Sequence, residues 1–179
     1  MTLRSHIYVV NFLILTSLLG LACAGRPHQA REEAGLKLTA LDVAGRGKPD
    51  TWRWTKPAEG TNPEILVKEE LDLNLDGKWD LRRYFDAGTL SRMEIDLDFD
   101  GKPDVVEFYE KGLLSRVESS HNFSGKVDTW KFYEKGVLTR IERDTNGDGK
   151  PDEWLYYSDG RLKRLGRDLN FDGIVDTWE

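Results

Sequence analysis

The chain has 179 residues, with 26 Lys and Arg against 32 Asp and Glu, which gives a formal net charge of −6 at pH 7. A chain of this sign is not drawn to the phosphates of nucleic acid, so nucleic acid binding is excluded as a bulk effect. The sequence contains one cysteine, so an internal disulfide cannot stabilise the fold.

Residues 1–22 have the composition of a secretory signal. One early arginine precedes a mostly apolar run, which is too short and too interrupted by polar residues to predict a membrane-spanning helix. The run ends in Leu19-Gly20-Leu21-Ala22-Cys23, which resembles the lipobox of bacterial lipoproteins, with Gly20 in place of the usual leucine. The resemblance implies that Cys23 carries a lipid anchor, palmitate included, and becomes the first residue of the mature chain.

Residues 23–35 are predicted to be the lipidated cysteine and a polar, flexible tether. In Gram-negative lipoproteins the residue after the cysteine helps to choose the membrane, and Ala24 is not the aspartate associated with retention at the inner membrane. The resemblance therefore implies a protein of the bacterial cell envelope that is anchored to the outer membrane. The membrane is then a partner, reached through the lipid.

Residues 36–71 are predicted to hold a degenerate first copy of a repeat. The segment from Leu41 to Trp54 keeps Asp42, Gly47 and Asp50 but lacks the other acids of the later copies. Terminal repeats of an array are commonly atypical, so this segment is interpreted as an N-terminal cap.

Residues 72–179 contain a repeat with a fixed period of 24 residues. A loop with the pattern D-x-[DN]-x-D-G-x-x-D begins at Asp72, Asp96, Asp144 and Asp168, and Ser120 opens a decayed copy at the same interval. A fixed period of this size indicates a repeat architecture in which each unit carries its own site. Such an array favours a binding or structural protein over an enzyme with one catalytic cleft.

The loops hold oxygen ligands at the spacing that wraps a hard cation. Counted from the opening residue, side-chain oxygens fall at positions 1, 3, 5 and 9, glycine at position 6 permits the turn, and the carbonyl at position 7 adds an oxygen. Because all these ligands are oxygens, Ca²⁺ is the predicted cation. The candidate metal ligands are Asp72, Asn74, Asp76, Asp80, Asp96, Asp98, Asp100, Asp104, Glu107, Asp144, Asn146, Asp148, Asp152, Asp168, Asn170, Asp172, Asp176 and Glu179.

Two of the loops also resemble an EF-hand, because Glu107 and Glu179 stand at position 12, where an EF-hand places a bidentate glutamate. The other loops resemble the shorter calcium loops of dockerin-like and thrombospondin type 3 repeats. The alternative is that Asp and Gly serve only as turn formers.

The decayed copy, Ser120 to Asp128, lacks the carboxylates at positions 1 and 5 and is predicted to bind calcium weakly or not at all.

The segments between the loops alternate like β-strands and turn at an x-Gly pair, which is typical of a two-residue hairpin turn. The pairs are Ala87-Gly88, Lys111-Gly112, Lys135-Gly136 and Asp159-Gly160. The fold class is therefore predicted to be all-β, with tandem 24-residue β-hairpin repeats in an up-and-down meander or curved sheet and the calcium loops at one end. The loop residues at position 4 are expected to turn inward and close that end of the core: Leu75, Phe99, Phe123 and Phe171.

The same numbering, counted from the opening residue of each loop, continues through the hairpin. A two-residue turn predicts that the position numbers of two directly opposed residues add up to 33. One face then collects positions 11, 13, 20 and 22 and is mainly apolar, whereas the other collects the arginines of position 21 and, near the turn, the tyrosines of position 14. This second face is a candidate partner surface, formed by Arg92, Arg116, Arg140, Arg164, Tyr109, Tyr133 and Tyr157. It is either an exposed ladder of ion pairs or a docking surface for an acidic glycan or a protein of the envelope.

The hairpin segments, such as TWKFYEKGVLTRIE from Thr129 to Glu142, resemble the MORN-type repeats of bacterial proteins. Together with the D-x-[DN]-x-D-G loops and the lipobox, they resemble repeat-bearing bacterial lipoproteins. The resemblance covers the segment from Leu41 to Glu179 and implies an array of β-hairpins in the cell envelope.

The sequence predicts no catalytic residues. It shows no Ser-His-Asp order, no histidine cluster and no glycine-rich phosphate loop, so we predict that the chain is not an enzyme. We expect a calcium-binding, lipid-anchored envelope protein that acts as a structural or interaction module. Two alternatives stay open, namely a metal-independent envelope spacer and a carboxylate-based enzyme that acts on envelope glycans.

Overall fold

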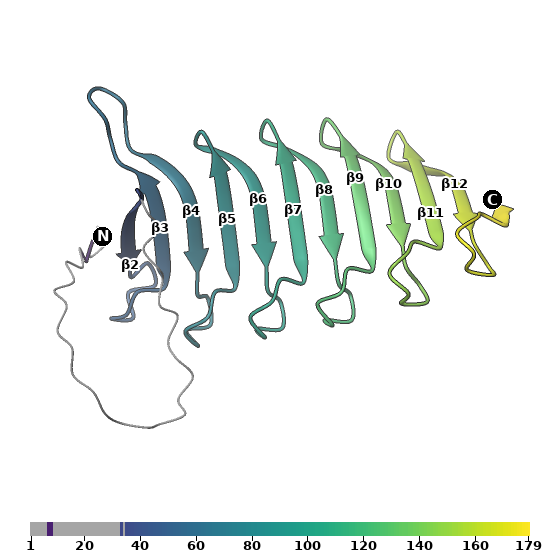
Figure 1. Cartoon of the computed structure of the whole chain (residues 1–179), viewed down its shortest axis with the longest axis horizontal. Coiled ribbons are helices and arrows are strands. Elements are labelled where there is room, and N and C mark those ends of the chain that lie inside the picture. Colours follow the sequence, from purple (N-terminus) through teal and green to yellow (C-terminus); the bar gives the residue numbers. More distant parts are fainter. Residues whose placement is uncertain (1–6, 9–32, 34) are drawn as a thin grey trace. The chain divides into compact units, whose positions relative to one another are not determined.

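The computed structural model describes residues 7–8, 33 and 35–179, and every regular element in them is a β-strand (Figure 1). The chain divides into two compact units, residues 1–88 and 89–179. Within each unit the strands are antiparallel and follow one another in chain order, so the predicted all-β, up-and-down fold is confirmed. Of the predicted signal only residues 7–8 are described, and Cys23 and nearly all of the tether lie outside the described residues. No helix in the described part is long and apolar enough to cross a membrane.

The first unit contains the degenerate repeat and the first intact loop. Trp54 is almost fully buried, and the ammonium of Lys68 on the neighbouring strand lies 3.8 Å from its ring centre. Trp79 is buried as well, beneath the guanidinium of Arg82 at 3.9 Å. Tryptophan burial beneath cations therefore supplies much of the packing in this unit. Its strands are β1 (Ile7–Tyr8), β2 (Lys37–Leu41), β3 (Thr51–Lys56), β4 (Ile65–Leu71) and β5 (Leu81–Asp86).

The second unit is a sheet in which each strand contacts only the strands before and after it in the chain, so it does not close on itself. Its most buried apolar side chains are Val117, Ile141 and Leu155, which are opposed across neighbouring strands or through one intervening residue. The strands are β6 (Thr89–Ile95), β7 (Val105–Glu110), β8 (Leu113–Ser119), β9 (Thr129–Glu134), β10 (Val137–Arg143), β11 (Glu153–Ser158), β12 (Arg161–Arg167) and β13 (Thr177–Trp178).

The predicted two-residue turns are confirmed in the second unit. The first residues of its hairpin turns, Lys111, Lys135 and Asp159, have φ values of 52° to 54°, and the glycines that follow have φ values of 69° to 80°. Positive φ at both central residues is the signature of the turn whose twist matches that of antiparallel strands. The acidic loops therefore lie at the opposite end of the hairpins from these turns (Figure 1).

The predicted register holds only near the turn. Glu110 pairs with Leu113 as expected, but Phe108 pairs with Arg116, because a β-bulge inserts one extra residue at position 20 of β8. In that bulge Ser115 donates its hydroxyl to the carbonyl of Phe108 at 3.0 Å. The same shift recurs in the next two hairpins of the unit.

The bulge corrects the predicted faces of the sheet. The arginines of position 21 now oppose the aromatic residues of position 13, so these two sets share one face with positions 11 and 23. We call it the arginine–aromatic face. The side chains of positions 12, 14 and 22 form the opposite face. The arginines therefore oppose the residues of position 13 and not the tyrosines of position 14, although Tyr109 and Tyr133 line one groove with Arg116 and Arg140.

The phenylalanines at position 4 of the loops do not plug the core, which corrects that expectation for them, whereas Leu75 at the same position is half-buried. Phe99, Phe123 and Phe171 remain 43%, 48% and 50% exposed. Their φ values of 66°, 55° and 61° lie in the left-handed region, which turns the loop at this position. The side chain is thereby directed away from the sheet core.

Candidate metal centre

A backbone ladder stacks the loops at one end of each hairpin. In the second unit the N–H of Ser120 bonds to the carbonyl of Asp104, and that of Asp144 bonds to the carbonyl of Asp128, both at 2.8 Å. Asp168 bonds in the same way to Asp152 at 2.9 Å. The opening residue of one loop is therefore fixed against the closing aspartate of the loop before it.

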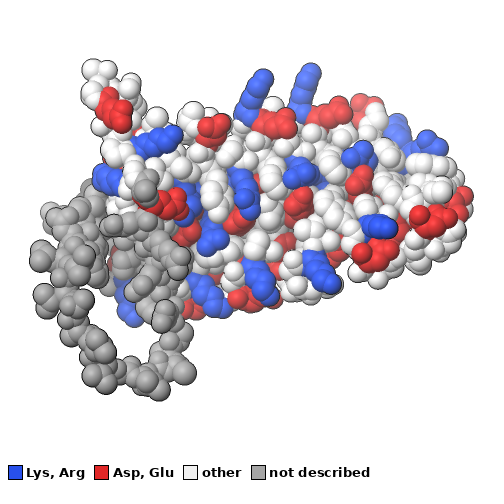
Figure 2. Space-filling view, viewed as in Figure 1, with Lys and Arg blue, Asp and Glu red and all other residues white. Residues whose placement is uncertain are grey.

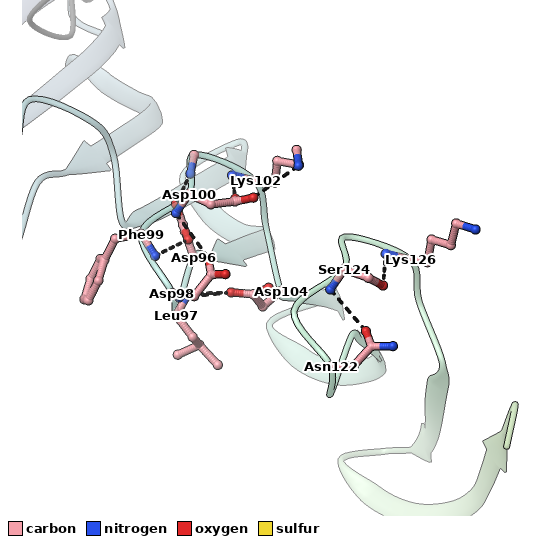
Figure 3. Close-up of polar contacts among 11 residues, drawn as sticks. Asp96, Leu97, Asp98, Phe99, Asp100, Lys102, Asp104, Asn122, Ser124 and Lys126 are labelled. Carbon is pink, nitrogen blue, oxygen red and sulfur yellow. Dashed lines mark hydrogen bonds and ion pairs between the residues drawn. The ribbon is translucent and has the colours of Figure 1, made fainter. Parts of the chain in front are cut away.

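The loop from Asp96 to Asp104 shows how one candidate site is built (Figure 3). The Asp96 carboxylate accepts the N–H of Phe99 at 2.8 Å and the N–H of Gly101 at 2.7 Å. Asp104 Oδ2 accepts the N–H of Leu97 at 2.7 Å. These bonds curl the backbone around its own carboxylates and require a φ of 97° at Gly101, which glycine adopts without strain.

Three carboxylates converge in this loop. Asp96, Asp98 and Asp104 each place an oxygen within 4.8 Å of the others. Asp96 and Asp104 are buried, whereas Asp98 is exposed. In Figure 3 the side chains of Leu97 and Phe99 point away from this cluster. The donor set is all oxygen and open on one side, and it therefore fits a hard divalent cation.

The same hydrogen bonds recur in the other intact loops. The opening aspartate accepts the N–H of position 6 at 2.7 to 2.9 Å, and the closing aspartate accepts the N–H of position 2 at 2.6 to 2.9 Å. The oxygens of positions 3 and 5 accept the N–H groups of positions 5 and 7. The four intact loops thus share one hydrogen-bonding pattern at positions 1, 3, 5 and 9, and among the described residues Asp96, Asp98 and Asp104 are the carboxylates that converge within 4.8 Å of one another.

The first intact loop contains two buried carboxylate oxygens without a partner. Asp72 and Asp80 are 4% and 1% exposed, and Oδ1 of each makes no hydrogen bond. A buried, unpaired polar atom costs about 1–3 kcal/mol, and more when it is charged. A cation held in this loop would supply the interaction that these oxygens lack.

The carboxylates of the intact loops repel one another. Burial raises the pKa of Asp80 above its usual range, and the charges of Asp72 and Asp76 raise it further, against the lowering effect of its backbone hydrogen bonds. Burial likewise raises the pKa of Asp96, with a further increase from Asp100 and Asp104. In these loops the neighbouring charges and burial together outweigh the stabilising N–H groups.

The degenerate loops show the opposite balance. Burial opposes ionisation of Asp50 and Asp128 too, but hydrogen bonds lower the pKa of each below its usual range. Asp50 accepts the N–H groups of Ala44 and Val43, and Asp128 is paired with the ring of His121 at 2.8 Å. The raised pKa values of Asp80 and Asp96 therefore do not follow from the loop shape alone.

The decayed loop keeps the shape without the acids. Phe123 and Gly125 have φ values of 55° and 73°, as in the intact copies. Asn122 accepts the N–H of Ser124 at 3.1 Å, and the Ser124 hydroxyl accepts the N–H of Lys126 at 3.3 Å (Figure 3). Hydroxyl and amide groups can thus close the loop, so the aspartates at positions 1 and 5 are not needed for the turn itself.

The predicted ligands at position 12 lie in or directly after a strand, Glu107 within β7 and Glu179 after β13. Glu107 in β7 accepts the hydroxyl of Tyr109. Burial and this hydrogen bond raise the pKa of Tyr109 to about 12. Glu179 pairs with Arg167 at 2.6 Å. The EF-hand-like completion of these two loops stays a prediction.

A set of residues on the arginine–aromatic face was missed. Ser91, Ser115 and Thr139 stand at position 20 of successive repeats and line a groove beside the arginines. The recurrence of a hydroxyl residue at position 20 could have indicated the bulge. The bulge residue separates the part of the strand near the turn from a part whose pairing register is shifted.

Comparison with known proteins gives no family. No family model matches the chain, and no curated protein matches it either. Among solved structures, the chain is similar to accessory secretory protein 1, 2 and 3 of Streptococcus pneumoniae, with 16% identity, a TM-score of 0.42, and coverage of 64% of this chain and 20% of that one. It is also similar to the Gap123 glycosylation-associated complex of Streptococcus agalactiae, with 14% identity, a TM-score of 0.43, and coverage of 66% and 20%. The chain thus spans about one fifth of each of these proteins.

The contrast between intact and degenerate loops predicts an order of carboxyl titrations. In protein freed of metal by a chelator, Asp80 and Asp96 should titrate above the usual range of aspartate, and Asp50 and Asp128 below it. Carboxyl carbon shifts followed by NMR against pH measure this order. If Asp80 and Asp96 titrate below Asp128, the repulsion between loop carboxylates is too weak to matter.

Proposed function

We propose that this chain is a calcium-binding, lipid-anchored repeat protein of the bacterial cell envelope that serves as an interaction module. The observation that carries the calcium part is the pair of buried, unpaired oxygens of Asp72 and Asp80 within one acidic loop. It is supported by the converging carboxylates of Asp96, Asp98 and Asp104 in the next loop.

Calcium is favoured over other cations by the chemistry of the donors. The loops offer carboxylate, amide and carbonyl oxygens but no thiolate, and the only imidazole in a loop, His121, lies in the decayed copy. Flexible oxygen-rich loops suit Ca²⁺, whereas Mg²⁺ demands a tighter octahedral geometry. We expect affinities on the order of 10⁻⁴–10⁻³ M, as in extracellular modules.

A metal-independent spacer is the second candidate function. The decayed loop supports it, because Ser120 to Asp128 adopts the shared turn with hydroxyl and amide groups alone. On this alternative the aspartates would act only as acceptors for backbone N–H groups. The spacer leaves the unpaired oxygens of Asp72 and Asp80 without an explanation, so we rank calcium binding first.

Restoring the decayed loop separates the two candidates. The double substitution Ser120→Asp and Ser124→Asp recreates the acidic pattern, so it should add one calcium ion to the number that the protein binds. It should also enlarge the rise in melting temperature on going from chelator to calcium, because a ligand that binds only the folded state stabilises it. Calorimetric titration and thermal melting measure both effects.

The matched control for this experiment is the pair Ser120→Asn and Ser124→Asn, which changes size in nearly the same way without adding charge. This variant should bind no additional ion. Equal calcium stoichiometry in the wild type, the aspartate variant and the asparagine variant would favour the spacer.

The lipid anchor is part of the proposal on the strength of the lipobox-like sequence that ends in Cys23. In a bacterial host, labelled palmitate should enter the wild-type chain and not the Cys23→Ala variant, which should leave the membrane fraction. Equal membrane association of the two proteins would contradict the anchor without bearing on calcium.

A further inference from the structure

A groove of about 760 Å³ lies on the arginine–aromatic face of the second unit, towards the hairpin turns. The residues of position 13 in three successive hairpins line it, namely Phe108, Phe132 and Tyr156. Ser115 and Thr139 lie beside them at the bulges. The groove therefore presents the same kinds of side chain once in every repeat.

Arginine side chains lie over the aromatic rings of this groove. The guanidinium carbon of Arg116 lies 4.2 Å from the ring centre of Phe108, and that of Arg140 lies 4.2 Å from the ring centre of Phe132. A cation over a ring is attracted by it, and the Nε of each of these arginines is buried. These repeats thus combine an aromatic ring with the terminal N–H groups of a guanidinium.

The charges of the groove are balanced. Arg116 pairs with Glu118 at 3.2 Å, and Arg140 pairs with Glu142 at 3.0 Å. Glu110 and Glu134 add two further carboxylates to the lining. Basic and acidic side chains are likewise interleaved on the surface seen in Figure 2. An acidic polymer would meet more carboxylates than unpaired cations, so the acidic glycan considered from the sequence is disfavoured at this groove.

The spacing of the repeated features limits the ligand. Equivalent residues of successive hairpins are two strands apart, which is about 9.6 Å in a β-sheet. This spacing is close to the length of one extended disaccharide in a β-1,4-linked glycan. It is also close to one turn of a polyproline helix, about 9.3 Å. A linear polymer that crosses the strands can therefore meet each repeat in the same way.

Hydrogen-bond chemistry decides between the two polymers. A proline-rich segment offers carbonyl acceptors but few donors, so Glu110 and Glu134 would lose water without gaining a partner. Sugar hydroxyls both donate and accept, so they can bond to these carboxylates, to the arginine N–H groups and to the hydroxyls of Ser115 and Thr139. The half-buried aromatic side chains of the groove suit the apolar faces of sugar rings.

We propose that this groove binds a neutral, linear, β-1,4-linked glycan that runs across the strands with one disaccharide per repeat. Cellulose-type and chitin-type chains share this geometry and differ only in the group on the second carbon of the sugar. The proposal rests on the interaction role proposed above and names a ligand for it. The groove contains no residue of an acidic loop, so an experiment can disprove calcium binding without disproving glycan binding, and the reverse.

The test is a calorimetric titration of the full chain with cellohexaose and with chitohexaose, each in calcium and in chelator. At least one hexasaccharide should bind, and its disaccharide should bind about tenfold more weakly or worse, because a longer chain engages more than one repeat. Binding in chelator as well as in calcium is expected. A result with both hexasaccharides unbound would overturn the proposal, whatever the outcome for calcium.

A groove-filling variant shows where the sugar binds. Lys163 occupies position 20 in the last hairpin, so Ser115→Lys with Thr139→Lys places a residue that the fold already accepts there. This variant should lose hexasaccharide binding by about tenfold or more. The control Glu59→Lys changes the net charge by the same amount at an exposed residue between β3 and β4 of the first unit, which neither lines the groove nor belongs to an acidic loop, and should bind normally.

Three outcomes contradict the proposal. Equal loss in the groove variant and the Glu59→Lys control would mean that charge, not the groove, governs binding. Preferential binding of an acidic oligogalacturonate would mean that the arginines act as unpaired cations. Tighter binding of a proline-rich peptide than of either hexasaccharide would assign the groove to a polypeptide.

Discussion

The hydrogen bond between the opening residue of one loop and the closing aspartate of the loop before it is the constraint on which the rest of the structure depends. It is repeated at Ser120, Asp144 and Asp168 in the second unit, and at Asp72 in the first, where the partner is Asp50. Because this bond recurs once per hairpin, the backbone at positions 1 and 9 is fixed at the end of the sheet. Most of the side chains there are buried, among them Asp72, Asp80, Asp96 and Asp104, and burial gives their charges an energetic consequence.

Burial of these carboxylates produces two kinds of loop from one backbone shape. Where acids also occupy positions 3 and 5, as around Asp96, mutual repulsion adds to the cost of burial and a cation offsets both. Where hydroxyl or imidazole groups replace the neighbouring acids, as around Asp128, hydrogen bonds are sufficient and ionisation is favoured. The repeat can therefore lose a cation site without losing its turn, which explains how an acid-poor copy persists between intact ones.

The all-β class, the hairpin turns and the positions of the acidic loops could be predicted, because each rests on local chemistry: alternation, an x-Gly pair, and Asp and Gly at fixed offsets. The assignment of residues to the two faces could not. It depends on one extra residue at position 20, exemplified by Ser115, which reverses the alternation of everything beyond it on the strand. The outward direction of Phe99 was missed for a similar reason, since its positive φ is imposed by the loop and not by its apolar character. In both places backbone geometry overrides the pattern of side-chain polarity.

The central claim is that the four acidic loops hold calcium while the Ser120 loop, which has the same shape, does not. Anomalous diffraction from crystals grown in calcium tests it most directly, because it locates each ion in a particular loop. The account predicts anomalous peaks within the loops that open at Asp72, Asp96, Asp144 and Asp168, and none within the loop that opens at Ser120. An absence of peaks from all four acidic loops, or a peak of equal height in the Ser120 loop, would contradict it.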